Sequence, residues 1–485
     1  MPLDLDAYRA QAEEFLSETD REYYLHYSGQ RDEFEIEAVF ERHAELFTRE
    51  AADSLREAQA PGALVEFAIE GHIGRETRAA SGELARREAA LEIEWDGERI
   101  PFRAAAVVEA NEQDPERRAA LDAARNELME AELNPLLREL LDTTHAITRD
   151  LGWPSVRAMC EELSGIDLGA LAEQTNAFLE ATEPRYEELV EPQLRQQLGM
   201  GFDRLRRSDL PAFFRAPTLD ADFPAERLMP SLTETLTEMG IEVSRQRGVT
   251  IDAVPRPKKS PRAFCSPVRV PDEVYLVISP VGGREDYAAL FHEAGHTEHY
   301  AHVDPALPVE ERYRGDNSVT ESYAFLFEHL TAAPAWLRRR LGVEQTEAIV
   351  EYATASTLVF LRRYAAKLAY EMELQGGGPV DGLKDVYARG LSEALHVDWP
   401  AASWLADVDS FFYSARYLRA WALETRLRAA LRERFGETWF AEPSAGDFLR
   451  DLWSTGQGAA GGEGILAQAG GDSLDFSALI ADVGV

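Results

Sequence analysis

Cysteine is scarce in this chain, and so are long apolar runs. The sequence has 485 residues but only two cysteines, Cys160 and Cys265, whereas a secreted disulfide scaffold is much denser in them. No stretch approaches the roughly 20 uninterrupted apolar residues that a membrane-spanning helix needs. The amino terminus carries acidic residues where a secretory signal would carry a basic patch. We therefore expect a cytoplasmic protein with reduced cysteines and no membrane partner.

Positive charge is also in short supply. The chain has 50 Lys and Arg residues against 87 Asp and Glu residues, which gives a formal net charge of −37. Such a surface repels a phosphate backbone, and no basic cluster offsets it locally, so we expect no nucleic-acid partner. Hydrophobic residues make up 45% of the sequence. This is enough for a large core, and the length predicts two domains or two lobes of one fold.

Helical periodicity dominates the sequence up to about residue 240. Apolar residues recur three or four positions apart in stretches such as LDAARNELMEAEL and LLRELLDTTHAI, as expected for helices that bury one face. The exception lies at residues 91–103, where apolar and polar residues alternate around Asp96 and Gly97, a pair favoured in tight hairpin turns. We expect a helical lobe over residues 1–240 that contains one small hairpin.

The pattern changes after residue 240. β-Branched residues and prolines become frequent, and we expect a small antiparallel sheet there. Its last strand ends at Pro280 and leads through Gly282 and Gly283 into the helix AALFHEAGHTEHYAHV. The chain is again helical from residue 317 to about residue 440. The predicted fold is therefore mainly α, with a second lobe over residues 241–485 in which the sheet precedes this helix.

The helix after the sheet carries the pattern H-E-x-x-H at residues 292–296. His292 and His296 are one turn apart on the same face, so both imidazoles can reach one zinc ion at about 2.0–2.1 Å. Glu293 is offset by about 100° around the axis. It can therefore lean over the open coordination position and take a proton from an attacking water. The apolar flank AALF argues against two solvated histidines on a surface helix.

A catalytic zinc site needs a third protein ligand. Glu321 lies 25 positions after His296, at the start of the next predicted helix, and completes a set of two histidines and one glutamate for a single Zn²⁺ ion. Glu328 lies two turns further on the same face and can accept the free ring N–H of a ligating histidine. Glu310 and Glu311 are alternative carboxylates, but their proline-flanked loop predicts solvated charges instead.

Three segments of the chain resemble the thimet oligopeptidase and oligoendopeptidase F family of zinc metallopeptidases: RAFCSPV, DYAALFHEAGHTEHY and TESYAFLFEHL. The family motif H-E-[FL]-G-H-x-x-H is matched here by His292, Glu293, Gly295, His296 and His299. The family's third ligand lies about 25 residues further on and is followed seven positions later by another Glu, as in this chain. The start of the third segment, Glu321-Ser322, is also similar to the related thermostable carboxypeptidases of the Taq type.

The resemblance implies a two-lobed helical metallopeptidase with a deep central channel that has zinc on its floor and admits short peptides. It also implies that His299 supports the metal ligands from outside. In relatives, the strand before the metal-binding helix pairs with the substrate backbone, which gives affinity without strict side-chain selection. In this chain that strand consists of Val274, Tyr275, Leu276, Val277, Ile278 and Ser279.

Peptide hydrolysis also needs a hydrogen-bond donor aimed at the developing oxyanion. Tyr413 and Tyr417 lie one turn apart in a segment that resembles the family's tyrosine-rich stretch, and we prefer Tyr417. Aromatic residues at this spacing also occur as core packing. His396 is a further candidate donor. Arg416 and Arg419 could bind a terminal carboxylate, although we interpret them as solvated surface residues.

Together these features predict a zinc-dependent oligopeptidase that hydrolyses short peptides as a monomer or homodimer. A metallocarboxypeptidase that removes single residues from the carboxyl end is the first alternative. A zinc-bearing binding protein without catalysis is the second. Glu293 opposes the second alternative, because a protein that only binds zinc has no need of a carboxylate at that position.

Overall fold

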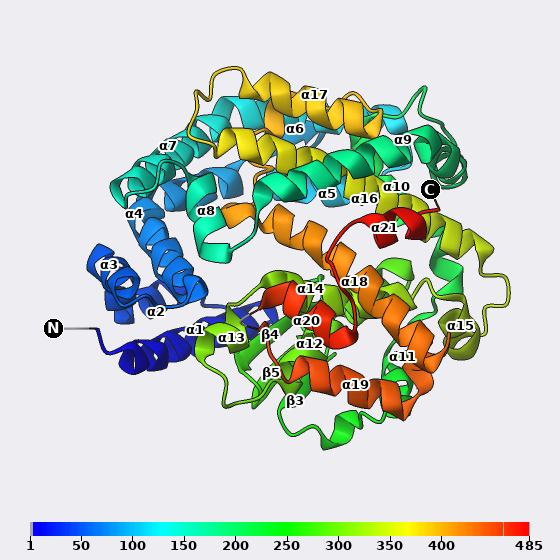
Figure 1. The fold of residues 1–485 in the computed structure, drawn as a ribbon. Coiled ribbons are helices and arrows are strands. Elements are labelled where there is room, and N and C mark those ends of the chain that lie inside the picture. Colours follow the sequence, from blue (N-terminus) through cyan, green and yellow to red (C-terminus); the bar gives the residue numbers. More distant parts are fainter. Residues whose placement is uncertain (1–2, 459, 485) are drawn as a thin grey trace. The chain divides into compact units, whose positions relative to one another are not determined.

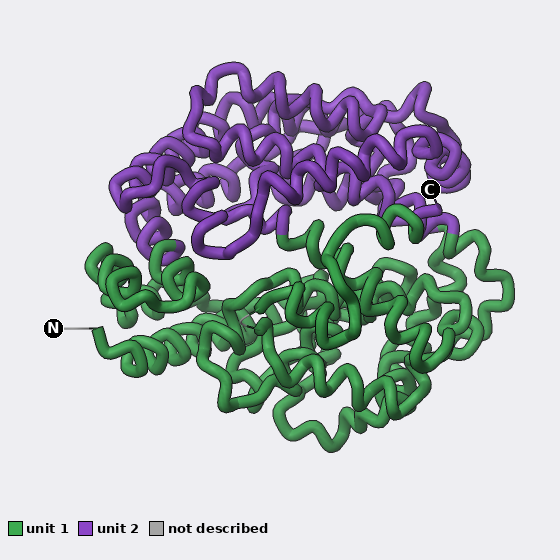
Figure 2. Tube along the Cα trace, in the orientation of Figure 1, with its two compact units in different colours: residues 1–69, 218–350, 416–482 green, residues 70–217, 351–415, 483–485 purple. Residues whose placement is uncertain are grey.

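The structure is a computed structural model that describes residues 3–458 and 460–484 (Figure 1). The chain forms two compact units, and each is assembled from separate stretches of sequence (Figure 2). Unit 1 comprises Met1–Ile69, Thr218–Val350 and Arg416–Asp482, and unit 2 comprises Glu70–Pro217, Glu351–Ala415 and Val483–Val485. The units therefore do not follow the predicted division at residue 240. Local periodicity predicts helices, but it does not say which distant helices pack together.

Unit 2 is helical and contains one hairpin. Most of α4 (Gly62–Ala90) and of α16 (Glu347–Leu374) belongs to it, and each of these helices begins in the sequence range of unit 1. The other helices of unit 2 are α5 (Ala105–Asn111), α6 (Pro115–Leu128), α7 (Asn134–Asp150), α8 (Val156–Ser164), α9 (Leu168–Leu198), α10 (Leu210–Arg215) and α17 (Leu383–Leu395).

Strands β1 (Glu92–Trp95) and β2 (Glu98–Pro101) form the hairpin where the sequence predicts it. The strands are antiparallel, and Ile93 lies opposite Ile100. Both isoleucines are buried and pack in a cluster with Leu121 of α6. Alternation along each strand therefore places the apolar side chains on one face, against the helices.

No helix in the described part of the chain is both long enough and apolar enough to cross a membrane.

Unit 1 combines helices with a small sheet. The helices of unit 1 are α1 (Leu5–Tyr27), α2 (Ile36–Arg42), α3 (Arg49–Glu57), α11 (Ala225–Glu238), α12 (Arg284–His302), α13 (Val309–Tyr313), α14 (Asn317–Leu330), α15 (Pro334–Trp336), most of α18 (Tyr413–Phe435), α19 (Pro443–Trp453), α20 (Gly461–Ala469) and α21 (Ser477–Asp482).

The sheet of unit 1 has three strands in the order β3–β5–β4. Strand β4 (Phe264–Arg269) is antiparallel to β5 (Glu273–Val277), whereas β3 (Val249–Asp252) is parallel to β5. The prediction of an antiparallel sheet is therefore wrong for one of the two pairs. Parallel neighbours need a crossover connection, and here that connection contains β4 itself. As a result, β5 has a partner on each side, and β4 lies at an edge.

Helices α1 and α12 cover opposite faces of this sheet. On one face, the Tyr24 ring of α1 stacks on Tyr275 of β5, with centroids 3.7 Å apart. On the same face, Ser266 Oγ of β4 donates to the carbonyl of Asp20 at 2.8 Å. The neighbouring residue Cys265 points to the other face, toward α12. Both helices consequently border β4.

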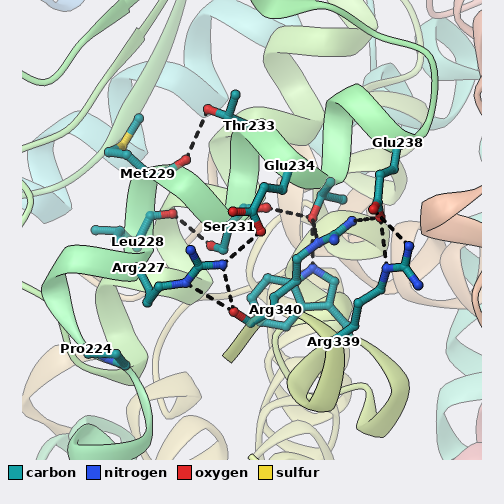
Figure 3. Close-up of polar contacts among 12 residues, drawn as sticks. Pro224, Arg227, Leu228, Met229, Ser231, Thr233, Glu234, Glu238, Arg339 and Arg340 are labelled. Atoms are coloured by element: carbon teal, nitrogen blue, oxygen red, sulfur yellow. Dashed lines mark hydrogen bonds and ion pairs between the residues drawn. The ribbon is translucent and has the colours of Figure 1, made fainter. Parts of the chain in front are cut away.

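Ion pairs connect α11 to residues 334–341 (Figure 3). Buried Arg340 donates to Thr235 Oγ1 at 3.0 Å and to the Glu238 carboxylate at 2.5 Å. Arg339 makes a two-pronged contact with Glu238 at 2.8 and 2.9 Å. The Arg339 hydrogen bonds, with those of Arg340, lower the pKa of Glu238 from 4.5 to about 2. The carboxylate is therefore charged at neutral pH and pairs with two guanidinium groups.

We expect Glu238→Gln to lower the free energy of unfolding by about 1–2 kcal/mol at neutral pH, because the buried Arg340 loses its charged partner. This energy is set low because about a third of the Glu238 side chain is exposed, and solvent weakens the ion pair. Folding depresses the pKa of Glu238, so its contribution is complete above 4.5 and is lost as the pH falls toward 2. Thermal unfolding between about pH 7 and about pH 3 should show the two proteins converging below about pH 4.5.

The matched control for this prediction is Glu234→Gln on the same helix. Glu234 pairs with Arg227 at 2.8 Å, and both side chains are more exposed than those of the Glu238–Arg340 pair. Removing this surface pair should cost less than about 0.5 kcal/mol. Equal losses in the two variants would contradict the special weight that we give to Glu238.

Candidate metal centre

Helix α12 begins directly after β5, at a turn that one of its own side chains closes. The backbone N–H groups of Val281 and Gly282 donate to the Asp286 carboxylate at 2.6 and 2.8 Å. Gly283 has a φ of 88°, and a Cβ there would lie 2.6 Å from the Asp220 carboxylate. A larger residue would be strained in its backbone and would clash. The turn therefore fixes the start of α12 relative to the sheet.

Helices α12 and α14 are in close backbone contact at Gly295. A Cβ at this position would lie 2.6 Å from Ala324 Cα and closer still to the Tyr323 carbonyl. Such distances are possible only because glycine has no side chain. This contact brings the amino-terminal half of α14 beside the histidines of α12.

The start of α14 is held by the carboxylate of Asp316. It accepts hydrogen bonds from the N–H groups of Ser318 and Gly462, each at 3.0 Å, and it pairs with Arg419 at 3.2 Å. Burial opposes the negative charge, but Arg419 and these hydrogen bonds keep the pKa of Asp316 below its usual value. A carboxylate at this position satisfies free amides of the first turn and complements the helix dipole. The cap thus positions the turn that carries Glu321.

His292, His296 and Glu321 form one compact group in unit 1. Glu321 Oε2 lies 3.5 Å from His292 Nε2 and 3.6 Å from His296 Nε2, and one ligand atom from each residue lies within 4.8 Å of the others. Two donors about 2.0–2.1 Å from a tetrahedral ion are about 3.3 Å apart. The spacing therefore suits a single small cation, and zinc uses this donor set in catalytic sites.

Further side chains orient both imidazoles. His292 Nδ1 lies 2.9 Å from Glu328 Oε2. A carboxylate accepts hydrogen bonds, so Nδ1 carries a proton directed at Glu328, and in the neutral ring Nε2 is then the nitrogen that offers a lone pair to a metal. His296 Nδ1 lies 2.8 Å from Thr320 Oγ1, which can accept a hydrogen bond from the ring N–H in the same way. Glu328 is the partner expected from its seven-residue spacing to Glu321.

The charges in this group favour a bound cation. Glu321 is only 5% exposed. Burial raises its pKa, but the two imidazoles, with His296 first, outweigh burial and bring the pKa below its usual value. Burial likewise lowers the pKa of His292, and the carboxylates of Glu321 and Glu328 raise it above its usual value. Glu321 is therefore ionised at neutral pH and offers a charged oxygen to a cation.

Glu293 lies next to the edge of the sheet. Its Oε2 accepts a hydrogen bond from the backbone N–H of Cys265 in β4 at 2.8 Å, and Thr297 Oγ1 donates to its carbonyl at 2.7 Å. The side chain is half-buried and does not belong to the ligand group. This agrees with its offset around the helix from the two histidines. Glu293 thus connects the histidine-bearing helix to β4.

Two contacts of this centre are absent from the sequence prediction: the Thr320 hydroxyl and the Cys265 backbone amide. A hydroxyl next to the ligand Glu321 is a signal that could have suggested Thr320, because ligating histidines usually have such partners. The amide of Cys265 has no signal of this kind. Strand register positions it, and register depends on the whole sheet.

His299 does not support the ligands as the sequence predicts. It is fully buried, and its ring packs against Tyr300 and Tyr323 with centroids 5.2 and 5.1 Å away. Among the described residues, no hydrogen bond joins it to His292 or His296. Seven residues rise about 10.5 Å along a helix, so His299 shares the side of His292 but lies too far along the axis. Burial lowers its pKa to about 3, which keeps the ring neutral.

Glu310 is not the solvated loop charge that the sequence predicts. It lies in α13 and is 3% exposed. Arg9 of α1 contacts its carboxylate through Nε at 3.1 Å and Nη2 at 2.5 Å. Glu310 therefore joins α13 to α1 and takes no part in the ligand group.

Tyr417 is the tyrosine candidate that lies in the same unit as the ligand group. Its ring centroid is 6.1 Å from that of Phe325, and Phe325 lies 5.3 Å from the ring of His292. Trp421 stacks on the same Phe325 at 4.7 Å. Tyr413 belongs to the sequence range of unit 2. These contacts place Tyr417 one ring away from a metal ligand.

The other candidate residues have different partners. Arg416 is buried and pairs with Glu66 at 2.5 Å, and Arg419 pairs with Asp316. The prediction that both arginines are solvated is therefore wrong. His396 lies in unit 2 between two glutamates, each 2.9 Å from a ring nitrogen. None of these three residues contacts the ligand group in the described structure.

The strand predicted to bind substrate, residues 274–279, has no open edge. Val274–Val277 pair with β3 on one side, and Tyr275, Leu276 and Val277 pair with β4 on the other. The backbone groups of β5 are thus already used, and strand addition to β5 is wrong. The edge strand next to Glu293 is β4, where the Cys265 N–H points away from β5 and donates to Glu293.

Comparison with known proteins shows a likeness of structure. No protein-family model and no curated protein matches the sequence. The chain is similar to a crystal structure assigned as an oligoendopeptidase F from Bacillus anthracis str. Ames, with a TM-score of 0.62 and 16% sequence identity. The match covers 96% of this chain and 80% of that chain. The prediction of a mainly α fold of this type is therefore confirmed.

We expect Gly295→Ala to weaken zinc binding at least tenfold, because its methyl group pushes α14, and with it Glu321, away from the histidines. Titration with zinc against a competing chelator measures the affinity. The control is Gly74→Ala in α4, where a Cβ meets nothing within 4 Å. Zinc affinity in Gly295→Ala equal to that of the control would contradict this account of the helix contact.

Proposed function

We propose that the protein is a zinc-dependent peptidase that hydrolyses short peptides. The observation that carries the proposal is the group of His292, His296 and Glu321 with Glu293 between it and the open edge of β4. An extended peptide can pair its backbone with such an edge, which would bring a peptide bond next to the metal centre. The structural likeness to a protein assigned as an oligoendopeptidase F supports the same class of reaction.

Three side-chain atoms would hold the zinc ion: His292 Nε2, His296 Nε2 and Glu321 Oε2. When bound, zinc supplies Lewis-acid polarisation of a peptide carbonyl and lowers the pKa of water. Glu328 and Thr320 keep the two rings in the tautomer that ligation needs. Three protein ligands leave room for a water molecule or substrate, as in other catalytic zinc sites.

Glu293 is the general base in this proposal. Its carboxylate takes a proton from the attacking water and later delivers it to the leaving amine. The hydrogen bond from the Cys265 N–H holds the carboxylate at the edge of β4, where the substrate backbone would lie. From this one position, Glu293 can take the proton from the water and deliver it to the leaving amine.

Strand β4 replaces β5 as the proposed substrate strand. Its outer edge carries backbone groups that β5 does not use, and it begins beside Glu293. Pairing along a strand edge recognises the peptide backbone rather than its side chains. This suits an enzyme that accepts peptides of varied sequence.

Tyr417 is the proposed donor to the oxyanion of the tetrahedral intermediate. Its ring packs against Phe325, which in turn contacts the ring of His292 and stacks on Trp421. A preorganised hydroxyl strengthens its hydrogen bond as negative charge develops on the substrate oxygen. Such a donor acts mainly on the transition state.

Cleavage of internal or near-terminal bonds is favoured over carboxypeptidase action. A carboxypeptidase needs a cationic group for the terminal carboxylate, and arginine usually supplies it. The two arginines of α18 that the sequence offers for this role are already paired with Glu66 and Asp316. We therefore propose an oligopeptidase.

Glu293→Gln should abolish peptide hydrolysis while zinc still binds in a 1:1 ratio. The amide keeps the size of the side chain but cannot accept a proton from water, so we expect a loss of about 10²–10⁴ in kcat. Hydrolysis of mixed short peptides and metal analysis of the purified variant measure the two quantities. Glu285→Gln, an exposed change on the same helix, should behave as wild type. Turnover that persists in Glu293→Gln would refute its assignment as the base.

Tyr417→Phe should lower kcat by about 10²-fold and change KM little, because the lost hydroxyl acts on the oxyanion of the transition state. Tyr413→Phe is the matched variant, one helical turn earlier. Steady-state kinetics on one peptide gives both parameters for each protein. A larger loss of kcat in Tyr413→Phe than in Tyr417→Phe would reverse the assignment.

A further inference from the structure

One face of α1 presents aromatic rings and a carboxylate beside β4. Asp20, Tyr23 and Tyr27 are three and four residues apart, so they share one side of the helix. The two tyrosines are 40% and 42% exposed, and their rings are nearly parallel at 5.8 Å. The Tyr27 ring also meets Phe264, the first residue of β4, at 6.4 Å. We call Asp20, Tyr23, Tyr27 and Phe264 the α1–β4 surface.

The carboxylate of Asp20 has no partner of its own on this surface. Among the described residues, no hydrogen bond or ion pair reaches its side-chain oxygens, and the hydrogen bond between Asp20 and β4 uses its backbone carbonyl. Burial raises the pKa of Asp20 to about 7, and the attraction of Arg314 offsets this only in part. An ionised carboxylate in such surroundings is costly to desolvate unless a cation compensates it.

The α1–β4 surface lies next to the proposed reaction site. Cys265 donates its N–H to Glu293, and the following residue, Ser266, bonds to Asp20. Burial raises the pKa of the Cys265 thiol, and the charges of Glu293 and Asp20 both add to this effect. Both carboxylates are therefore near the same short stretch of β4. A peptide on the outer edge of β4 would pass beside Glu293 and close to α1.

We propose that the α1–β4 surface recognises a positively charged group of the peptide, which Asp20 binds through its carboxylate and Tyr23 through its ring. This inference rests on the proposed peptidase function and adds a preference to it. Carboxylates and tyrosine faces both attract ammonium and guanidinium groups, and partial burial strengthens the attraction. The exposed aromatic pair also covers the apolar stem of a long basic side chain.

Two parts of a peptide carry this chemistry: the free α-ammonium group and a Lys or Arg side chain. The experiment therefore uses four fluorescent peptides of one sequence, with a free or acetylated amino end and with Lys or norleucine at one position. Affinity is measured on zinc-loaded protein with Glu293→Gln, which prevents hydrolysis. The assay runs at about pH 8, above the raised pKa of Asp20, so the carboxylate is charged.

The test compares the zinc-loaded Glu293→Gln protein with the same protein that also carries Asp20→Asn. Asp20→Glu serves as the conservative variant that retains the charge. Asp6→Asn is the matched control, because Asp6 lies on the same helix and is 95% exposed. Asp20→Asn should not reduce stability, since it removes a charge that burial disfavours. Thermal unfolding of each variant checks this.

We expect one of the cationic groups to raise affinity about tenfold over its neutral counterpart, which corresponds to about 1.4 kcal/mol. Asp20→Asn should remove most of this preference, while Asp20→Glu and Asp6→Asn should keep it. The pair of peptides whose difference in affinity disappears in Asp20→Asn shows whether the α-ammonium group or the basic side chain is recognised. Equal affinities for all four peptides, or a preference that survives Asp20→Asn, would overturn the inference.

Failure of this inference can be distinguished from failure of the proposed function. Hydrolysis of the same peptides by the wild-type enzyme tests the function alone. If wild type cleaves them and Asp20→Asn leaves the binding preferences unchanged, only the inference fails. If wild type neither cleaves nor binds any peptide, both fail.

Discussion

The contact between α12 and α14 at Gly295 is the constraint on which the metal centre depends. It places a buried carboxylate from one helix beside two imidazoles from the other. Burial of Glu321 alone would be unfavourable, and the two imidazoles offset this cost. The cap at Asp316 and the turn at Gly283 fix the starts of the two helices. The ligand group is therefore a product of helix packing rather than of flexible loops.

The sheet adds a second function to this packing. Helices α1 and α12 lie on opposite faces, and both border the edge strand β4. An open edge is ordinarily a hazard because it invites pairing with other chains. Here the edge lies beside Glu293, and in the proposed function the same pairing presents a peptide to a general base. In the further inference, the nearby carboxylate of Asp20, whose backbone carbonyl bonds to Ser266 of β4, gives this edge a preference for positive charge.

Local spacing in the sequence predicts that the side chains of the candidate ligand group lie close together. The positions of His292, His296 and Glu328 follow from helical periodicity, and the structure brings them together with Glu321. The mainly α fold and the hairpin at residues 91–103 also follow from periodicity and turn residues. These features depend on residues that are close in sequence or on one regular helix.

Features that depend on long-range packing are not predicted. The parallel pairing of β3 with β5 makes β5 the central strand and moves the open edge to β4. The seven-residue spacing of His299 from His292 places it on the right side of the helix but too far along the axis. Glu310 is buried by Arg9, which lies 301 positions earlier in the chain. Local sequence patterns do not predict these features, because each feature depends on which distant segments of the chain pack together.

X-ray absorption spectroscopy of the zinc-loaded protein tests the central claim most directly, because it reports the atoms around the metal. The account predicts one zinc per chain, with two imidazole nitrogens and a carboxylate oxygen at about 2.0–2.1 Å. Glu321→Ala should reduce the oxygen contribution and leave both imidazoles in place. A sulfur ligand, a shell without imidazole, or a spectrum unchanged by Glu321→Ala would contradict the joint role of the two helices.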